Sequence, residues 1–411
     1  MSNYTQQDLC KIRTITTFLS LDRNQQNWPQ RINSAANFCQ QLSETFAAHG
    51  YSVQSIRIVT NPFGEYINTQ SLATARADLE YLSTLINAGN HSATRVRFAI
   101  GEAKTAHEIG LLPELIKEFG DLCNACINIG VDEHSVLDNR RIETAVAAVH
   151  KISRITDNGQ GNFNLTINFN CKPLIPYFPA SYHRTELGDQ YVLGLETPDL
   201  LVAALQAFQL GNTTEDHQVL THGYYQAMST ALNHQIKNIK QIIASAEINS
   251  SFNFAGIDSS AAPSKDCASM VDIYKLLGVE YFGAAGTTEA SALLTRVFKS
   301  ITSVPLVGFS GLMLAVTEDT GLAMGTINKQ FDIRALLTYS AVCGIGLDTV
   351  PIPGDTPLTK IAAIMRDTGT MAYRLDKPLT VRLFPVPGLK AGDITDFSGD
   401  DLCNCAVLAV P

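Results

Sequence analysis

The chain has 411 residues, with 30 Lys and Arg against 39 Asp and Glu, which gives a formal net charge of −9. This acidic balance argues against a protein that binds nucleic acid through a basic surface. Hydrophobic residues make up 45% of the chain and charged residues 17%, which favours a large buried core and excludes wholesale disorder. No apolar run reaches the roughly 18 residues of a membrane span, and the polar start lacks a secretory signal pattern. We therefore expect a cytoplasmic globular protein with no nucleic-acid or membrane partner.

Segments rich in β-branched and apolar residues alternate with helical patterns along the chain. Most of these segments are apolar on both faces, which is typical of interior strands with helices outside them. Apolar spacing and terminal glycines predict helices over residues 29–49, 200–210, 265–277 and 288–301. We expect strands over residues 11–21, 52–60, 94–100, 122–130, 164–169, 191–195, 252–257, 279–283, 307–316, 336–345 and 379–386.

Roughly ten strands with intervening helices predict one α/β barrel, or a barrel-like domain, over residues 1–411. The polar, helix-rich stretch 211–241 is interpreted as an excursion outside this barrel. A split into two domains near that stretch is the alternative.

The nine cysteines have no framework spacing, which is typical of reduced thiols. Cys123 and Cys126 lie on a predicted strand and would project to opposite faces, which is poor geometry for zinc or a disulfide. Cys403 and Cys405 would face the same side of an extended tail, too far apart for an easy disulfide. We interpret both pairs as free thiols.

The common nucleotide-binding and hydrolase motifs are missing from the sequence. Polar residues instead follow several predicted strands, and ligands of α/β sheets gather at the carboxyl ends of strands. Asp258 follows one such strand, and Glu318 and Asp319 follow another. Adjacent carboxylates can bind a metal ion or transfer protons. The alternative is a helix-capping turn at Asp258 and ordinary surface acids at the other two positions.

Three further stretches carry residues with chemical potential. Gly286-Thr287-Thr288 leads into a helix whose free N–H groups would favour an anion, although a plain strand-to-helix turn fits equally well. Cys343 is followed by a glycine that permits close approach of a ligand, and its alternative is a buried, packing thiol. His183 could be a general base or simply a loop histidine.

A set of short motifs, most of them in the C-terminal half, forms a pattern along the chain. The motifs are Ile12-Arg13-Thr14-Ile15-Thr16, Asp258-Ser-Ser-Ala-Ala-Pro263, Gly286-Thr287-Thr288, Gly308-Phe-Ser310-Gly311, Val316-Thr-Glu318-Asp319-Thr-Gly321, Ala341-Val-Cys343-Gly-Ile-Gly-Leu-Asp348, Ile352-Pro353-Gly354-Asp355-Thr356-Pro357 and Val381-Arg382-Leu-Phe-Pro385-Val-Pro387-Gly388 followed by Gly392-Asp393. Together they resemble the uncharacterised family known as domain of unknown function 711, a relative of the ribonucleotide reductase and pyruvate formate-lyase barrels.

The resemblance implies a ten-stranded α/β barrel with helices outside, which agrees with the strand count, but it supplies no reaction. The relatives carry a glycyl-radical segment near the C-terminus, and residues 387–393 do not have that form. No glycyl radical is therefore expected, and Cys343 would act as an ordinary thiol or as packing.

We expect an enzyme that acts on a small anionic metabolite at an acid-lined barrel mouth. The predicted catalytic residues are Cys343, His183 and Glu318. The predicted metal ligands, for Mg²⁺ or Ca²⁺, are Asp258, Asp319, Asp348 and Asp355. The predicted substrate-binding residues are Arg13, Gly286, Thr287, Thr288 and Ser310.

The alternative from another class is a non-catalytic metabolite-binding or regulatory protein on a retired radical-enzyme barrel. A third hypothesis keeps radical chemistry, with the radical supplied by another protein. A homodimer is the default expectation for a large soluble barrel, although no sequence feature names its interface.

Overall fold

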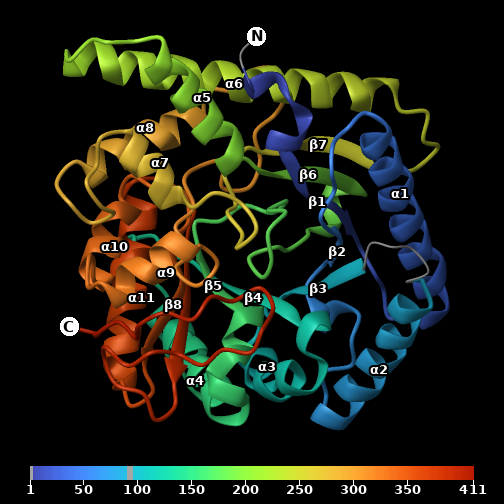
Figure 1. Cartoon of the computed structure of the whole chain (residues 1–411). Coiled ribbons are helices and arrows are strands. Elements are labelled where there is room, and N and C mark those ends of the chain that lie inside the picture. Colours follow the sequence, from blue (N-terminus) through green and yellow to red (C-terminus); the bar gives the residue numbers. More distant parts are fainter. Residues whose placement is uncertain (1–2, 90–95) are drawn as a thin grey trace.

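The computed structural model describes residues 3–89 and 96–411, and the chain forms a mixed α/β fold around one nine-stranded sheet. The first two residues of the predicted strand 94–100 lie outside the described residues. Figure 1 shows the strands near the centre of the molecule, with helices around the outside. The strands are β1 (Lys11–Leu19), β2 (Ile56–Thr60), β3 (Val96–Glu102), β4 (Asn124–Ile129), β5 (Leu165–Phe169), β6 (Gln190–Glu196), β7 (Asn253–Asp258), β8 (Gly346–Pro353) and β9 (Leu379–Val386).

The helices pack their apolar sides on the sheet and on one another. Long helices follow each of the first four strands, as expected for parallel strands that need crossover connections. The helices are α1 (Trp28–Ala48), α2 (Leu72–Gly89), α3 (Ala106–Phe119), α4 (Asn139–Ile155), α5 (Pro198–Leu210), α6 (His217–Ser245), α7 (Met270–Leu276), α8 (Thr287–Phe298), α9 (Thr320–Ile327), α10 (Ile333–Ser340) and α11 (Leu358–Arg374).

The sheet consists of two groups of strands that run in opposite directions. The strand order is β7-β6-β1-β2-β3-β4-β5-β9-β8. Strands β1 to β5 are parallel to one another, whereas β6 pairs antiparallel with β1, and β9 pairs antiparallel with β5. Strands β7 and β8 extend the second group in its own direction. The amino ends of β1 to β5 therefore meet the carboxyl ends of β6 to β9 at one end of the sheet.

The segment 305–316 lies between the two edge strands of the sheet. Leu306 forms a parallel bridge with Ile257 of β7, and Ala315 forms one with Asp348 of β8. The segment was predicted as a strand over 307–316, but it is irregular in between, because Gly308 and Ser310 have φ angles of 63° and 39°. Left-handed residues of this kind break the extended backbone that a ladder of hydrogen bonds needs.

Two other strand predictions were wrong. Residues 336–345 begin in helix α10, because the Asp332 side chain caps the helix by accepting from the Ala335 N–H at 2.8 Å. Residues 279–283 form a turn, bracketed by Gly278 and Gly283 with φ angles of 88° and 111°. Both stretches are apolar enough to pass for short strands, and local chain geometry overrides that pattern.

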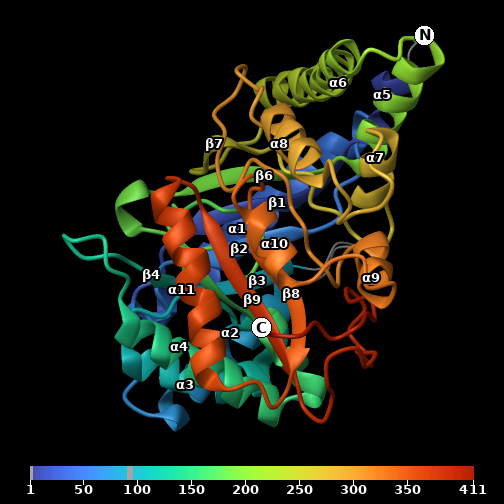
Figure 2. The same ribbon diagram turned by 90° about the vertical axis from the view of Figure 1, so that its left-hand side faces the viewer.

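The predicted excursion at 211–241 is mainly helix α6, which packs against α5 and α8 (Figure 2). Met228, Leu232, Ile236 and Ile239 are fully buried on its inner side. The exposed remainder of α6 explains why this stretch is polar in sequence. None of the helices in the described ranges is both long and apolar enough to span a lipid bilayer.

Candidate functional site

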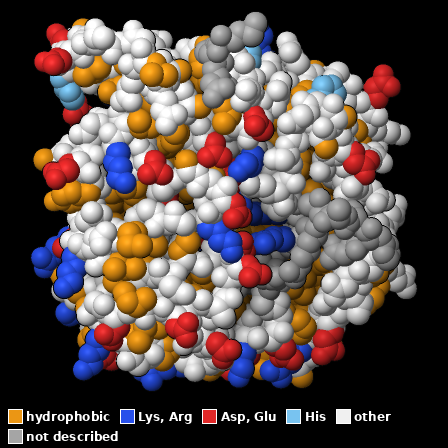
Figure 3. Space-filling model, in the orientation of Figure 1, with side chains coloured by type: hydrophobic (Ala, Val, Ile, Leu, Met, Phe, Trp, Pro, Cys, Tyr) orange, Lys and Arg blue, Asp and Glu red, His pale blue; other side chains and the backbone are white. Residues whose placement is uncertain are grey.

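Three arginines project from the amino ends of adjacent parallel strands. Arg13, Arg57 and Arg97 each lie within the first three residues of β1, β2 and β3. Each follows a buried Ile or Val. In β2 and β3 the alternation of the strand turns the apolar residue to one face and the arginine to the other, and in β1 a register irregularity between Ile12 and Thr14 interrupts the alternation at Arg13. The register pairs Arg57 with Arg97 directly, which places both guanidinium groups on the same face of the sheet. Figure 3 shows basic side chains, flanked by acidic ones, at the centre of one face of the molecule.

The arginines line two adjoining cavities of about 60 and 40 Å³. Arg13, Arg57, Phe178 and Glu318 line both of them. The first cavity also has an apolar wall and contains Asp348 and Arg382. The second cavity contains the other lining residues Arg97, Asn124, Phe163, Asn164 and Asp401.

Arg57 is a buried cation that forms no ion pair with a carboxylate in the described part of the chain. Its side chain is only 7% exposed, and no described carboxylate forms an ion pair with it. Its Nη1 donates to the Pro176 carbonyl at 3.3 Å, its Nε donates to Ser55 Oγ at 3.3 Å, and its guanidinium lies 4.8 Å from the centre of the Phe178 ring. Burial and, to a smaller extent, the neighbouring cations Arg13 and Arg97 together lower the pKa of Arg57 to about 9, against a weaker raising effect of Glu318.

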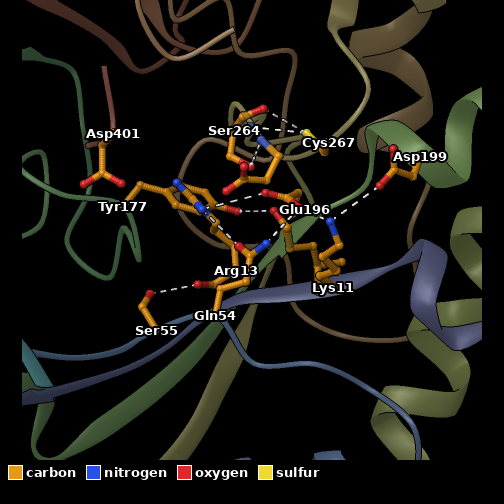
Figure 4. Close-up of polar contacts among 12 residues, drawn as sticks. Lys11, Arg13, Gln54, Ser55, Tyr177, Glu196, Asp199, Ser264, Cys267 and Asp401 are labelled. Atoms are coloured by element: carbon orange, nitrogen blue, oxygen red, sulfur yellow. Dashed lines mark hydrogen bonds and ion pairs between the residues drawn. The ribbon is translucent and has the colours of Figure 1, made fainter. Parts of the chain in front are cut away.

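The other two arginines of this row have acidic neighbours. Arg13 donates to Gln54 Oε1 at 3.0 Å and lies 3.7 Å from Glu196 (Figure 4). Glu196 is also bound by Lys11 at 2.9 Å, so its charge is shared. Both terminal nitrogens of Arg97 donate to Asp401, at 3.1 and 3.2 Å.

A second charged group faces the first cavity from β8, β9 and the segment before α9. Arg382 donates from Nε to Asp348 Oδ1 at 2.7 Å and from Nη2 to Glu318 Oε1 at 2.5 Å. All three side chains are at least four-fifths buried. Burial raises the pKa of Glu318, and nearby Asp348 raises it as well, against the lowering effect of Arg382. The second oxygen of Glu318 accepts no hydrogen bond from a described residue, so it is free to act on a ligand.

Of the three predicted catalytic residues, Glu318 lines the cavities and the other two do not. His183 is fully buried near the carboxyl end of β2, where its backbone N–H donates to the Thr60 carbonyl. Neither ring nitrogen of His183 has a hydrogen-bond partner among the residues that the structure describes, and burial lowers the pKa of His183 to about 4. Cys343 is fully buried, and the nearby Lys377 ammonium donates to its carbonyl oxygen.

Most of the predicted substrate-binding residues lie elsewhere in the fold. Arg13 lines both cavities. Gly286 caps helix α8, Thr287 donates to the Ala284 carbonyl at 2.7 Å, and Thr288 is exposed. Ser310 donates to the Val307 carbonyl at 2.8 Å and so belongs to the irregular segment described above.

The four predicted metal ligands have separate local roles. Asp258 accepts from the N–H groups of Ser260, Phe309 and Ser310 and from the Ser260 hydroxyl, and burial raises its pKa to about 6. Asp319 caps helix α9 and accepts from Ser269. In contrast, Asp348 lies in the first cavity, bound by Arg382, and Asp355 is exposed. Within residues 3–89 and 96–411, no three His, Cys, Asp or Glu side chains form a cluster suited to a metal ion.

Arg57, Arg97 and Arg382 were not among the predicted site residues. A signal for the first two was present, because the dipeptides Ile56-Arg57 and Val96-Arg97 repeat the Ile12-Arg13 pattern at a strand start. A charged residue inside a predicted interior strand is unusual unless it is paired or functional. Arg382 lies on a strand in the same way, within one of the motifs quoted above.

The sequence is similar to proteins from bacteria and archaea whose names state no activity. It is 28% identical over 305 residues to a UPF0210 protein of Thermoanaerobacter sp. (strain X514), covering 71% of this chain and 64% of that protein. It is 25% identical over 364 residues to a UPF0210 protein of Pyrobaculum arsenaticum, covering 85% and 77%. A UPF0210 protein of Neisseria meningitidis serogroup B is 28% identical over 296 residues, covering 70% and 63%. The chain thus spans just under two thirds of the length of the Thermoanaerobacter and Neisseria relatives.

The family described as uncharacterised ACR (DUF711) matches residues 3–398. That range includes the arginines of β1 to β3 and the charged group around Arg382. It ends just before Asp401, the partner of Arg97. The chain therefore belongs to the DUF711 family, whose members among the relatives above carry the name UPF0210.

Proposed function

We propose that this protein binds a small anionic metabolite in the two arginine-lined cavities and acts on it as an enzyme. The observation that carries the proposal is Arg57, a buried guanidinium that forms no ion pair with any described carboxylate. An unpaired buried charge is destabilising, so a protein that keeps one has a use for it. An anionic ligand would supply the missing counter-charge.

The balance of charge around the cavities supports an anion. Four arginines and three carboxylates line the two cavities together, an excess of one formal positive charge among the lining residues, and Arg13 shares a further carboxylate, Glu196, with Lys11. Arg57 also keeps its Nη2 free of described acceptors, so it can donate to a ligand. A guanidinium binds carboxylates and phosphates through charge-assisted hydrogen bonds, which strengthen where water is excluded.

Glu318 is the residue to which we assign proton transfer. It faces both cavities and has one oxygen without a described partner, and its pKa is raised, as suits an acid–base catalyst. His183 and Cys343 line neither cavity and have no role in this proposal. The non-catalytic alternative, a binding or regulatory protein, would use the same arginines without Glu318.

The finer architecture is part of the same proposal. We infer that the segment 305–316, with its bridges to β7 and β8, takes the place of a tenth strand and closes the sheet into a barrel. This arrangement would match the barrel that the resemblance to ribonucleotide reductase and pyruvate formate-lyase implies. The arginine row would then point into the barrel at one mouth.

Calorimetric titration with acetate and with inorganic phosphate tests the binding function. We expect the wild-type protein to bind at least one of these anions, and Arg57→Gln to weaken that binding by about 2 kcal/mol, or roughly thirtyfold. Arg76→Gln is the matched control, because Arg76 pairs with Glu118 on the outer surface of α2. The proposal fails if neither anion binds, or if Arg57→Gln and Arg76→Gln bind as the wild type does.

A further inference from the structure

We propose that the ligand is a short monocarboxylic acid, with its carboxylate on Arg57 and Arg13 and its hydrocarbon part against the apolar wall of the first cavity. This inference rests on the proposed function and narrows its substrate class. It excludes phosphate esters, dicarboxylates and nucleotides as the preferred ligands. Three features of the cavity lead to it: an apolar wall, a single lining arginine that forms no ion pair with a described carboxylate, and a small volume.

The apolar wall is a distinct hydrophobic cluster. Phe309, Met313, Ile345 and Ala262 line the first cavity together with the arginines, and each is at most 7% exposed. With Ile175, Tyr177 and Ala180 they form a buried cluster separate from the main core. The cavity is therefore charged on one side and apolar on the other. A ligand that fills it must have an anionic end and a hydrocarbon end, because polar atoms against this wall would lose their water without gaining partners.

The charge balance favours one negative charge on the ligand. Arg97, the other arginine of the row, already pairs with Asp401, and Arg382 pairs with Glu318 and Asp348. Among the arginines that line the cavities, Arg57 is the one without an ion pair to a described carboxylate, and Arg13 shares Glu196 with Lys11. A dianion would bring a second charge for which no unpaired cation is present among the cavity-lining residues. A monoanion matches the site.

The volume limits the length of the ligand. One water-sized group needs roughly 10–15 Å³ of cavity volume in this measure, so a cavity of about 60 Å³ holds roughly four to six such groups. A carboxylate group uses three heavy atoms. The remaining space fits about one to three carbons, as in acetate, propionate and butyrate, and is too small for a nucleotide.

The test is a calorimetric series on the full-length wild-type protein with acetate, propionate, butyrate, hexanoate, succinate and inorganic phosphate. Each methylene buried against the apolar wall is expected to raise affinity about fourfold from acetate to butyrate. Hexanoate, succinate and phosphate are expected to bind more weakly than butyrate. An affinity that does not rise with chain length, or a preference for succinate or phosphate, overturns this inference and leaves the proposed anion binding in place. If no anion in the series binds, the proposed function fails as well.

A variant of the apolar wall makes the assignment specific to this cavity. Met313→Gln keeps the length of the side chain but places a polar amide against the ligand. We expect it to abolish the rise in affinity from acetate to butyrate and to leave acetate binding within a factor of two. Met324→Gln is the control, since Met324 is 52% exposed and lies on α9 outside the cavity. Equal chain-length dependence in Met313→Gln and Met324→Gln would overturn the placement of the hydrocarbon part.

Discussion

Replacing Arg57 by methionine is expected to make the unliganded protein more stable. Lowering the pKa of this buried guanidinium from 12.5 to about 9 corresponds to a penalty on the order of 5 kcal/mol for the charged form in the folded protein. The arginine stays charged at neutral pH, so the folded state bears that penalty there. Methionine has a similar length, is uncharged and can pack against Phe178.

Part of this gain is offset by the contacts that Arg57 makes. The substitution removes the stacking on Phe178 and the hydrogen bonds to Ser55 and Pro176. The Pro176 carbonyl keeps another donor, because the hydroxyl of Thr16 also reaches it at 3.2 Å. Together these losses are about 2–4 kcal/mol. We therefore expect Arg57→Met to raise the free energy of unfolding by about 1–3 kcal/mol, within the range found when buried charges are replaced by hydrophobic residues.

Urea denaturation at neutral pH, followed by the fluorescence of Trp28, measures this change. Trp28 is the single tryptophan of the chain and is fully buried, so its emission reports unfolding. Arg76→Met is the control, and we expect it to change stability by less than about 0.5 kcal/mol, as is usual for an exposed ion pair. If Arg57→Met is clearly less stable than the control, Arg57 supports the fold rather than a ligand, and the reasoning is refuted.

Three further substitutions test other parts of the structure. Because burial lowers the pKa of His183 to about 4, the unfolded chain takes up a proton at this residue before the folded protein does, and the free energy of unfolding should fall by about 3 kcal/mol between pH 6.5 and 4. His183→Leu should remove that pH dependence in urea titrations across this range, and an unchanged pH profile would contradict the prediction. Arg382→Met should lower the free energy of unfolding by about 3–5 kcal/mol at pH 7, because the buried carboxylates of Glu318 and Asp348 lose their cation. A change below about 1 kcal/mol in denaturant titrations would argue against this pairing. Gly308→Ala should lower the melting temperature, because the φ angle of Gly308 is 63° and a Cβ atom there would lie 2.1 Å from Asp258 Oδ2. An unaltered melting temperature in calorimetry would show that the segment 305–316 adapts to the added methyl group.

Much of the fold followed from local patterns in the sequence. Eight predicted strands correspond to β1 to β7 and β9, because interior strands carry continuous apolar runs that helices outside the sheet do not. Strand β8 was not predicted. Residues 346–353 contain one glycine, two prolines, Asp348 and Thr349, a composition that is typical of a turn. The predicted strand just before it is instead a helix, because a capping aspartate initiates α10.

The candidate site was predicted only in part. Arg13, Glu318 and Asp348, which were predicted as site residues, line the first cavity. Each of them lies near the beginning or the end of a predicted strand. The site was predicted at the carboxyl ends of strands, whereas Arg57 and Arg97 lie at the amino ends of β2 and β3. The two positions coincide at one end of the sheet, because β6 to β9 run against β1 to β5. His183 follows β5, which runs parallel to β2, and it therefore lies at the other end of the sheet, beside the carboxyl end of β2.

By itself, the sequence determined that the chain is an α/β protein with an excess of acidic residues, and it supplied the motifs of the DUF711 family. These features can be seen in the sequence because composition, periodicity and short motifs are local properties of the chain. Only the tertiary structure decided which charged residues share a cavity. Arg13, Arg57, Arg97 and Arg382 are separated by up to 369 positions in the sequence and meet through strand pairing and strand direction. Whether a buried arginine has an acidic partner depends on that long-range pairing, and for Arg57 the folded chain provides none among its described residues.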